Sequence, residues 1–421
     1  MAKRKACKRE KGQLDFSDIH KSFKRNVESL EVFVNNVAPI AGKHDEVTKE
    51  KRHDIISQIV EIVRADKGMI KKRKRGVTIT TTSEDAAEKI AQLARGLPRL
   101  PQPQAQLLYR SSFVMLMSYF DFLLSDLIHY FYRKYPESLS GKELQLTLRD
   151  LKLLGDIDDA VNFIINKEAD SVLYDKLEKQ KLYLKNTLKI DTKDDIINWD
   201  KLVEAMERRH IVVHNDCKIN RRYLSNVDLS QVPEKAKDLK EGAQVLITES
   251  YFRSVFEEIC VSGMVLLQVC WRKWEKDDTA RADQQLALDI YDSLVKEDWT
   301  CAERLGLFSR GCDVRDQACR LVLDVNYCQS LKWQGKKREL QKEIKKFDTS
   351  ALSPKFILAV YALRSDRDRF YNNLENAITV DKMSEKDFTE WPLFRELRKD
   401  PDYEERIKTV FKSISEKEGK E

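Results

Sequence analysis

The chain has 421 residues, of which 35% are charged, and its formal net charge is +6. With only 13 glycines and 9 prolines it has few turn formers, so the composition favours a mainly helical protein of two or three domains. Neither a G-x-G-x-x-G nor a G-x-x-x-x-G-K-[ST] loop is present, which argues against a nucleotide-binding α/β core.

Residues 1–98 are expected to form a basic, helical N-terminal region. Residues 15–70 have the apolar spacing of two helices. A run of five basic residues follows: Lys71, Lys72, Arg73, Lys74 and Arg75. Such a run either contacts phosphate groups or is simply solvated. The sequence GVTITTT then predicts a short strand or one arm of a hairpin, and Ser83 is expected to cap the next helix.

A proline-rich linker, residues 97–104, leads into a predicted helical bundle over residues 99–275. Residues 105–134 predict a long helix with an apolar stripe typical of a bundle core. The stripe consists of Phe113, Met117, Phe120, Leu124, Leu127 and Phe131. Residues 147–190 predict three shorter helices, another helix is expected to begin near Asn198, and residues 248–274 predict a further long one.

Residues 276–421 predict a C-terminal helical domain. The sequence over residues 286–310 has the pattern of a helix, a short turn and a second helix. Paired helices of this kind stack into α-solenoids, but a plain helical bundle fits the pattern as well.

The thiols and the apolar segments indicate where the protein works. The eight cysteines include no C-x-x-C pair, and the basic N-terminus has no apolar run behind it. The longest apolar segment is interrupted by Asp121, Asp126 and His129, so it is not a convincing membrane span. We therefore expect a cytoplasmic protein with reduced thiols and no membrane contact.

The sequence ERRHIVVHND, residues 207–216, concentrates chemically capable side chains. At about 100° per residue, His210 and His214 lie about 40° apart on a helix, while Arg209 and His214 lie about 140° apart and flank a groove. Asn215 and Asp216 come where the helix should end, because Asn tolerates the left-handed conformation.

Three interpretations of this segment are open. The histidines could satisfy carbonyl groups at the helix end, which is a structural role. H-x-x-x-H could bind a metal, but Ile211 stands where H-E-x-x-H has its general base, and no third ligand is evident. The third interpretation is phosphodiester cleavage, in which arginine binds the phosphate, histidine transfers a proton and asparagine donates to an oxygen.

The segment RRHIVVHNDCKINRRYL, residues 208–224, resembles the signature of the HEPN superfamily, in which an arginine, a polar residue and a few spacer residues precede a histidine. Arg209, His210 and His214 match it, with four residues between Arg209 and His214. The helices expected upstream also look like those of the family, and the resemblance covers about residues 105–275. It is similar to the RiboL-PSP type found in bacterial toxin and phage-defence proteins.

The resemblance implies a HEPN-like bundle of four to five helices and a metal-independent endoribonuclease without a cofactor. His214 would transfer the proton, Arg209 would hold the phosphate and His210 would orient the pair. Asn215 would position the phosphate or the helix end. Asp121 would fix the guanidinium of Arg209, unless it points to solvent. Tyr223 is expected to pack against the bundle rather than stack on a base.

Cleavage by a 2′-hydroxyl needs both a base and an acid, and the resemblance implies a homodimer that supplies both. His210 as a second proton carrier within one chain is the rival explanation. The expected substrate is RNA, with tRNA among the candidates, and the expected role is that of a toxin or antiviral effector, which could have an antitoxin or regulatory partner. The alternative function is a non-catalytic helical adaptor that binds RNA or protein.

Overall fold

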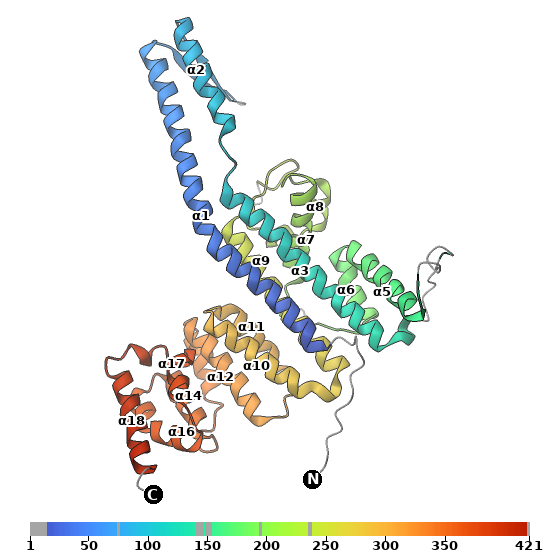
Figure 1. The fold of residues 1–421 in the computed structure, drawn as a ribbon, viewed down its shortest axis with the longest axis vertical. Coiled ribbons are helices and arrows are strands. Elements are labelled where there is room, and N and C mark those ends of the chain that lie inside the picture. The colour runs from blue at the N-terminus through green and yellow to red at the C-terminus, as the bar shows by residue number, and fades with distance from the viewer. Residues whose placement is uncertain are drawn as a thin grey trace. The chain divides into compact units, whose positions relative to one another are not determined.

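The computed structural model describes residues 15–73, 76–139, 147, 154–192, 196–234 and 238–418. The protein is built almost entirely of helices, with 76% helix and 3% strand, which confirms the predicted all-α class (Figure 1). The named strands form one antiparallel hairpin.

Contacts divide the chain into two compact units. The first contains residues up to Asp126 together with 173–178 and 199–259, and the second contains the remainder. Two long helices, α3 (Gln104–Lys134) and α9 (Glu249–Trp274), contribute residues to both units. The three segments expected from the sequence, with boundaries at residues 98 and 275, stay a prediction.

The first unit joins the N-terminal helices to the segment that carries the histidine motif. Besides parts of α3 and α9, its elements are α1 (Phe16–Ala65), β1 (Met69–Arg73), β2 (Gly76–Thr80), α2 (Glu84–Gly96), η1 (Leu97–Arg99), α7 (Trp199–His214), α8 (Arg221–Asn226) and η3 (Leu229–Gln231).

Residues 15–70 do not form the two helices expected from the sequence. One helix of 50 residues, α1, runs through this region with Pro39 inside it. Proline removes a hydrogen bond from a helix, but here packing on both sides of it stabilises the helix. The first half buries an apolar stripe, and the second half buries Ile59 and Val63 in a cluster with Ile90 of α2. The stripe consists of Phe16, Ile19, Phe23, Val27, Leu30 and Val34.

The predicted strand is one arm of a hairpin that follows α1. In its register, Ile70 pairs with Ile79 and Lys72 with Val77. Asp66, at the end of α1, accepts hydrogen bonds from the backbone N–H of Thr82 and from the hydroxyl of Ser83. A Cβ atom at position 68 would collide with the backbone around Thr80, so glycine is required there. These contacts fix the base of the hairpin between α1 and α2.

Side-chain caps set the starts of α2 and α3. The Ser83 hydroxyl accepts from the backbone N–H of Ala86 at 3.3 Å, which confirms the predicted N-cap. After the proline-rich linker, the carboxylate of Asp45 on α1 accepts from the N–H groups of Gln104 and Ala105 at 2.6 and 2.9 Å. An acid at a helix N-terminus stabilises its free N–H groups, so α1 determines where α3 begins.

Aromatic side chains connect α3 to α9 in the first unit. The rings of Tyr109 and Phe252 lie 5.8 Å apart, and those of Phe113 and Tyr251 lie 5.7 Å apart. Every member of the predicted apolar stripe of α3 is buried, which confirms it as core. The segment Glu84–Lys134 and the helix α9 are apolar and long enough to cross a membrane, but 50% and 72% of their apolar windows are buried, as in the core helices of globular proteins.

The second unit is a series of short helices that pack on their neighbours. Its elements, besides parts of α3 and α9, are η2 (Pro136–Leu139), α5 (Ile157–Tyr174), α6 (Leu177–Asn186), η5 (Lys276–Asp278), α10 (Thr279–Val295), α11 (Trp299–Arg310), α12 (Gln317–Trp333), α13 (Lys337–Ile344), α14 (Pro354–Arg364), α15 (Arg367–Asn372), α16 (Leu374–Val380), α17 (Glu385–Glu390), η6 (Pro392–Phe394), η7 (Leu397–Lys399) and α18 (Tyr403–Glu418).

Two of the three helices expected in residues 147–190 are α5 and α6, and residues 148–153 lie outside the described part of the chain. The helix–turn–helix expected near residues 286–310 is present as α10 and α11, and both helices pack on α12. The last helices enclose a core of Leu358, Phe370, Leu374, Phe388 and Phe394.

Candidate functional site

The helix α7 carries the motif and begins at Trp199, directly after the expected position, Asn198. In its C-terminal half it buries one face, which includes Arg208, Ile211 and Val212. The opposite arc, which runs from Arg209 through Val213 to His214, is partly or fully exposed. Because the helix period places these residues on the outer arc, their polar groups are accessible from solvent.

Arg208 is a core residue, although it is charged. Its side chain is 0% exposed, and its guanidinium donates to Glu204 at 2.7 Å and to both carboxylate oxygens of Glu234 at 2.8 and 2.9 Å. It also lies over the ring of Tyr251, 4.0 Å from the centroid. A buried arginine with all these partners is fixed in place, so Arg208 connects α7 to the segment that follows it.

Tyr223 completes this buried network. Its hydroxyl donates to Glu204 at 2.5 Å, and its side chain is 0% exposed. The predicted packing role of Tyr223 is therefore confirmed.

Arg209 lies beside Asp121 of α3, as expected for a carboxylate that orients it. The Nη2 of Arg209 is 3.5 Å from an Asp121 carboxylate oxygen, and the two side chains are 36% and 17% exposed. The other carboxylate oxygen of Asp121 and the Nε of Arg209 are buried without a hydrogen-bond partner. Burial raises the pKa of Asp121 to about 6, against the opposing effect of the Arg209 guanidinium. The pair therefore keeps unused hydrogen-bonding capacity.

The two histidines of the motif contact each other. The ring centroids of His210 and His214 lie 4.8 Å apart with the rings tilted by 50°. His210 is half-buried and His214 is exposed. The pKa of His210 is lowered, first by burial and then by the charge of Arg222, and both effects favour the neutral imidazole. The motif thus forms two pairs, Arg209 with Asp121 and His210 with His214.

The end of α7 differs from the prediction in one detail. The left-handed residues are Asp216 and Cys217, with φ of 47° and 60°, and not Asn215. Their conformation is held by the N–H of Cys217, which donates to the carbonyl of Ile211 at 3.0 Å. The side-chain amide of Asn215 donates to the carbonyl of Lys218 at 2.6 Å. Asn215 therefore closes the helix end, which is one of its two expected roles.

Arg110 of α3 covers the same helix end. Its guanidinium donates to the carbonyl of Val212 at 3.0 Å and pairs with Asp216 at 3.2 Å. A cation at a helix C-terminus interacts favourably with the free carbonyls. Arg110 therefore contributes to the stability of this helix end, and the structural role considered for the histidines stays open.

The sequence alone did not single out Glu207 and Arg222 as neighbours of the histidines. The Arg222 guanidinium donates to both carboxylate oxygens of Glu207, with Nε–Oε2 at 3.0 Å and Nη2–Oε1 at 3.1 Å. Glu207 precedes His210 by three residues, so both lie on one face of α7. That spacing was a visible signal for Glu207, but nothing local could place Arg222.

The basic run lies on the hairpin that follows α1. Lys71, Lys72 and Arg73 are exposed on β1, whereas Lys74 and Arg75 lie outside the described residues. Exposed cations on a short, fixed hairpin are accessible to a phosphate backbone.

No group of three or more His, Cys, Asp or Glu side chains within the described ranges could hold a metal ion. The seven cysteines in those ranges are free thiols. Protein-bound zinc usually needs three or four such ligands, so the described residues offer no site for it.

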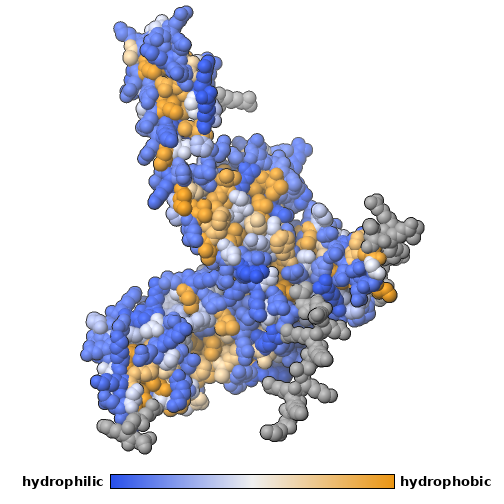
Figure 2. Space-filling model, viewed as in Figure 1, coloured by the Kyte–Doolittle hydropathy of each residue, from blue (hydrophilic) through white to orange (hydrophobic). Residues whose placement is uncertain are grey.

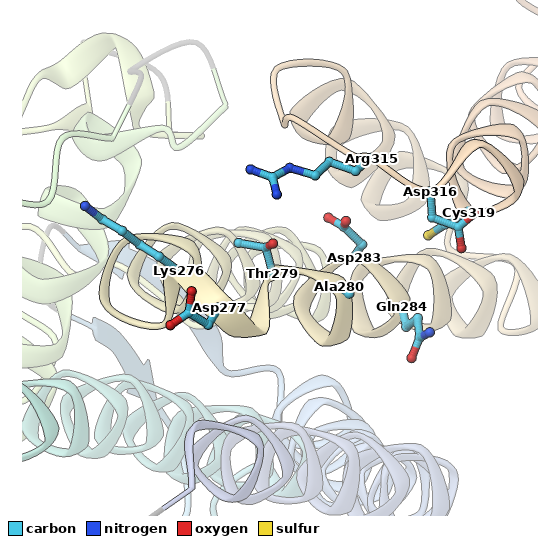
Figure 3. Close-up of a pocket in the computed structure, with 9 residues that line it drawn as sticks. All are labelled: Lys276, Asp277, Thr279, Ala280, Asp283, Gln284, Arg315, Asp316 and Cys319. Carbon is cyan, nitrogen blue, oxygen red and sulfur yellow. The ribbon is translucent and has the colours of Figure 1, made fainter. Parts of the chain in front are cut away.

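A depression of about 290 Å³ lies in the second unit, between the start of α10 and the start of α12 (Figure 3). Arg315 extends over it, and Asp283 rises from α10 below. Asp283 pairs with Arg272 at 2.7 Å, and Asp316 caps α12. Burial raises the pKa of the Cys319 thiol in its lining, so this thiol is a poor nucleophile. These paired charges define no particular ligand.

No family model, curated protein or solved structure matches this chain.

Proposed function

We propose that the chain is a metal-independent endoribonuclease of the HEPN type. The observation that supports the proposal most directly is the grouping of the His210–His214 imidazole pair with the Arg209 guanidinium on one exposed arc of α7. A cation near the last carbonyls stabilises a helix end, and Arg110 is such a cation here. The exposed side chain of His214 is accessible to a substrate.

In the proposed reaction, the 2′-hydroxyl of RNA loses its proton to a base and attacks the adjacent phosphorus. The bond between phosphorus and O5′ breaks, and an acid donates a proton to O5′. The products are a 2′,3′-cyclic phosphate and a 5′-hydroxyl end. His214 transfers a proton, and Arg209 binds the non-bridging oxygens and stabilises their developing charge.

Three other residues position this pair. Asp121 orients the guanidinium of Arg209 from α3. His210 orients His214 through ring contact, and its lowered pKa favours the neutral imidazole, which is the form that can accept a proton. Asn215 holds the helix end through its bond to Lys218.

We also propose that the active form is a homodimer. Arg209 and His214 lie on opposite sides of the exposed arc, so a second copy would bring a further arginine and histidine to the same phosphate. Exposed apolar side chains on α3 and α7 favour an interface, because covering them removes apolar surface from water. They are Met115 (46% exposed) and Phe122 (54%) of α3 and Val213 (51%) of α7.

The hairpin residues Lys71, Lys72 and Arg73 are proposed to bind the RNA backbone, with tRNA among the candidate substrates. A cytoplasmic toxin or antiviral effector, controlled by an antitoxin or regulatory partner, is the biological role that the resemblance implies. The second candidate function is a non-catalytic adaptor that binds RNA or protein, and the same exposed apolar side chains of α3 favour it.

Incubation of the purified chain with total RNA and a tRNA pool in EDTA tests the proposal. The wild type is expected to cut RNA, and His214→Ala is expected to lower the rate by about 10²- to 10⁴-fold, since general acid–base catalysis contributes that much. His53→Ala, which removes an exposed histidine of α1, is the matched control and should cut like the wild type. A folded wild type that cuts nothing would favour the adaptor.

A further inference from the structure

Four side chains gather on the face of α7 that is directed toward α8. Glu207, His210 and His214 recur at spacings of three and four residues, which puts them on one face of the helix. Arg222 of α8 reaches the same face through its bonds to Glu207. Burial first, and then the charge of Arg222, lower the pKa of His210. The histidines therefore have a guanidinium beside them that is not Arg209.

Arg222 is held from one side and open on the other. Its Nε and Nη2 bond to Glu207, whose side chain is only 7% exposed and which also accepts from the amide of Asn226 at 3.0 Å. The Arg222 side chain is 47% exposed, and its Nη1 has no hydrogen-bond partner among the described residues. A buried carboxylate thus fixes the guanidinium while its outer edge stays free to donate.

The two neighbouring arginines, Arg208 and Arg221, do not share the combination of features found at Arg222. Arg208 is fully buried, and its guanidinium is used by Glu204 and Glu234. Arg221 is 89% exposed and bonds to Glu241 at the surface. Only Arg222 of these three combines a fixed guanidinium with a free edge beside the histidines.

We infer that Arg222, with His210 and His214, forms a phosphate-binding site for the RNA backbone on the α8 side of α7. The inference rests on the proposed function and adds to it a residue outside the motif. Arg222 donates to a non-bridging oxygen of a phosphodiester, and Glu207 acts as a positioning residue that aims the guanidinium. Glu207 also keeps the local charge balanced when no RNA is bound.

Binding of a fluorescent 2′-O-methyl RNA, which lacks the attacking hydroxyl, tests the inference separately from cleavage. Arg222→Ala is expected to raise Kd about tenfold, and Arg221→Ala, the matched control, less than twofold. The slope of log Kd against log salt should fall by about 0.7 for Arg222→Ala with a single-stranded RNA, because one phosphate contact is lost. A purely structural salt bridge would not change this slope.

Arg222→Lys keeps a positive charge beside Glu207, so it should fold even if Arg222→Ala does not. Thermal melting checks that it is folded. It is expected to melt like the wild type and still to bind RNA several-fold more weakly, since lysine lacks the fork. Equal affinities and slopes for Arg222→Ala and Arg221→Ala would overturn the inference, as would a wild type that does not bind the RNA. A wild type that binds through Arg222 but does not cut natural RNA would overturn the proposed function alone.

Discussion

Arg208 and Arg209 are neighbours in the sequence with opposite environments. Arg208 is 0% exposed among acids and tyrosines, whereas Arg209 lies at the exposed edge of α7 beside Asp121. The sequence identified the pair but could not assign the two roles, because burial depends on which face of α7 meets the other segments. Adjacent residues of a helix are rotated by about 100° about its axis, and this rotation makes Arg208 a core residue and Arg209 a candidate phosphate ligand.

Asp121 should make the stability of the protein depend on pH. Its folded pKa of about 6 lies above its ordinary value of 3.8, so the folded state binds more protons between these pH values. The contribution of this carboxyl to stability is therefore full below about pH 4 and is lost as the pH rises through 6. We expect Asp121→Asn to remove this loss and to raise the free energy of unfolding at pH 7 by about 1–3 kcal/mol.

Urea denaturation at pH 4 and pH 7 measures this effect. Asp18→Asn, which changes a carboxylate that is 57% exposed on α1, is the control and should keep the pH dependence of the wild type. If Asp121→Asn also keeps the pH dependence of the wild type, the pKa of Asp121 is not raised in the folded protein. The same variant should cut RNA more slowly, because Arg209 loses the carboxylate that orients it.

At the scale of elements, the sequence predicted the features that depend on contacts between residues close together in the chain. The apolar stripe of α3 and the cap at Ser83 follow from side chains a few residues apart, and the structure has both. The continuity of α1 through Pro39 was not predictable, because distant packing on both halves offsets the missing hydrogen bond. The pairing of Arg222 with Glu207 was equally hidden, since it depends on the path of the chain after α7.

The hairpin should contribute charge to RNA binding. Three exposed cations, Lys71, Lys72 and Arg73, lie on β1. If they contact phosphates, replacing all three by alanine should lower the slope of log Kd against log salt by about 2, at roughly 0.7 per contact for a single strand. Fluorescence anisotropy over a salt series measures the slope.

The control for this variant also loses three positive charges, but on a different helix. Lys337, Arg338 and Lys342 are exposed on α13, and replacing these three by alanine should leave the slope nearly unchanged. Equal slopes for the two triple variants would mean that the hairpin cations are solvated and do not contact RNA phosphates.

At the scale of the whole molecule, the candidate site draws on three separated parts of the chain. Asp121 comes from α3, the histidines and Arg209 come from α7, and Arg222 comes from α8. All three belong to the first compact unit, which also contains the hairpin (Figure 1). Figure 2 shows hydrophobic residues grouped on parts of the visible surface. Exposed hydrophobic patches are typical of surfaces that associate with another molecule.

The measurement that tests the central claim most directly is end-group analysis of RNA cut by the purified wild type in EDTA. Attack by the 2′-hydroxyl predicts 2′,3′-cyclic phosphate and 5′-hydroxyl ends, and His214→Ala should produce neither above background. Products with 3′-hydroxyl and 5′-phosphate ends, or cleavage that needs added metal, would contradict the proposed mechanism.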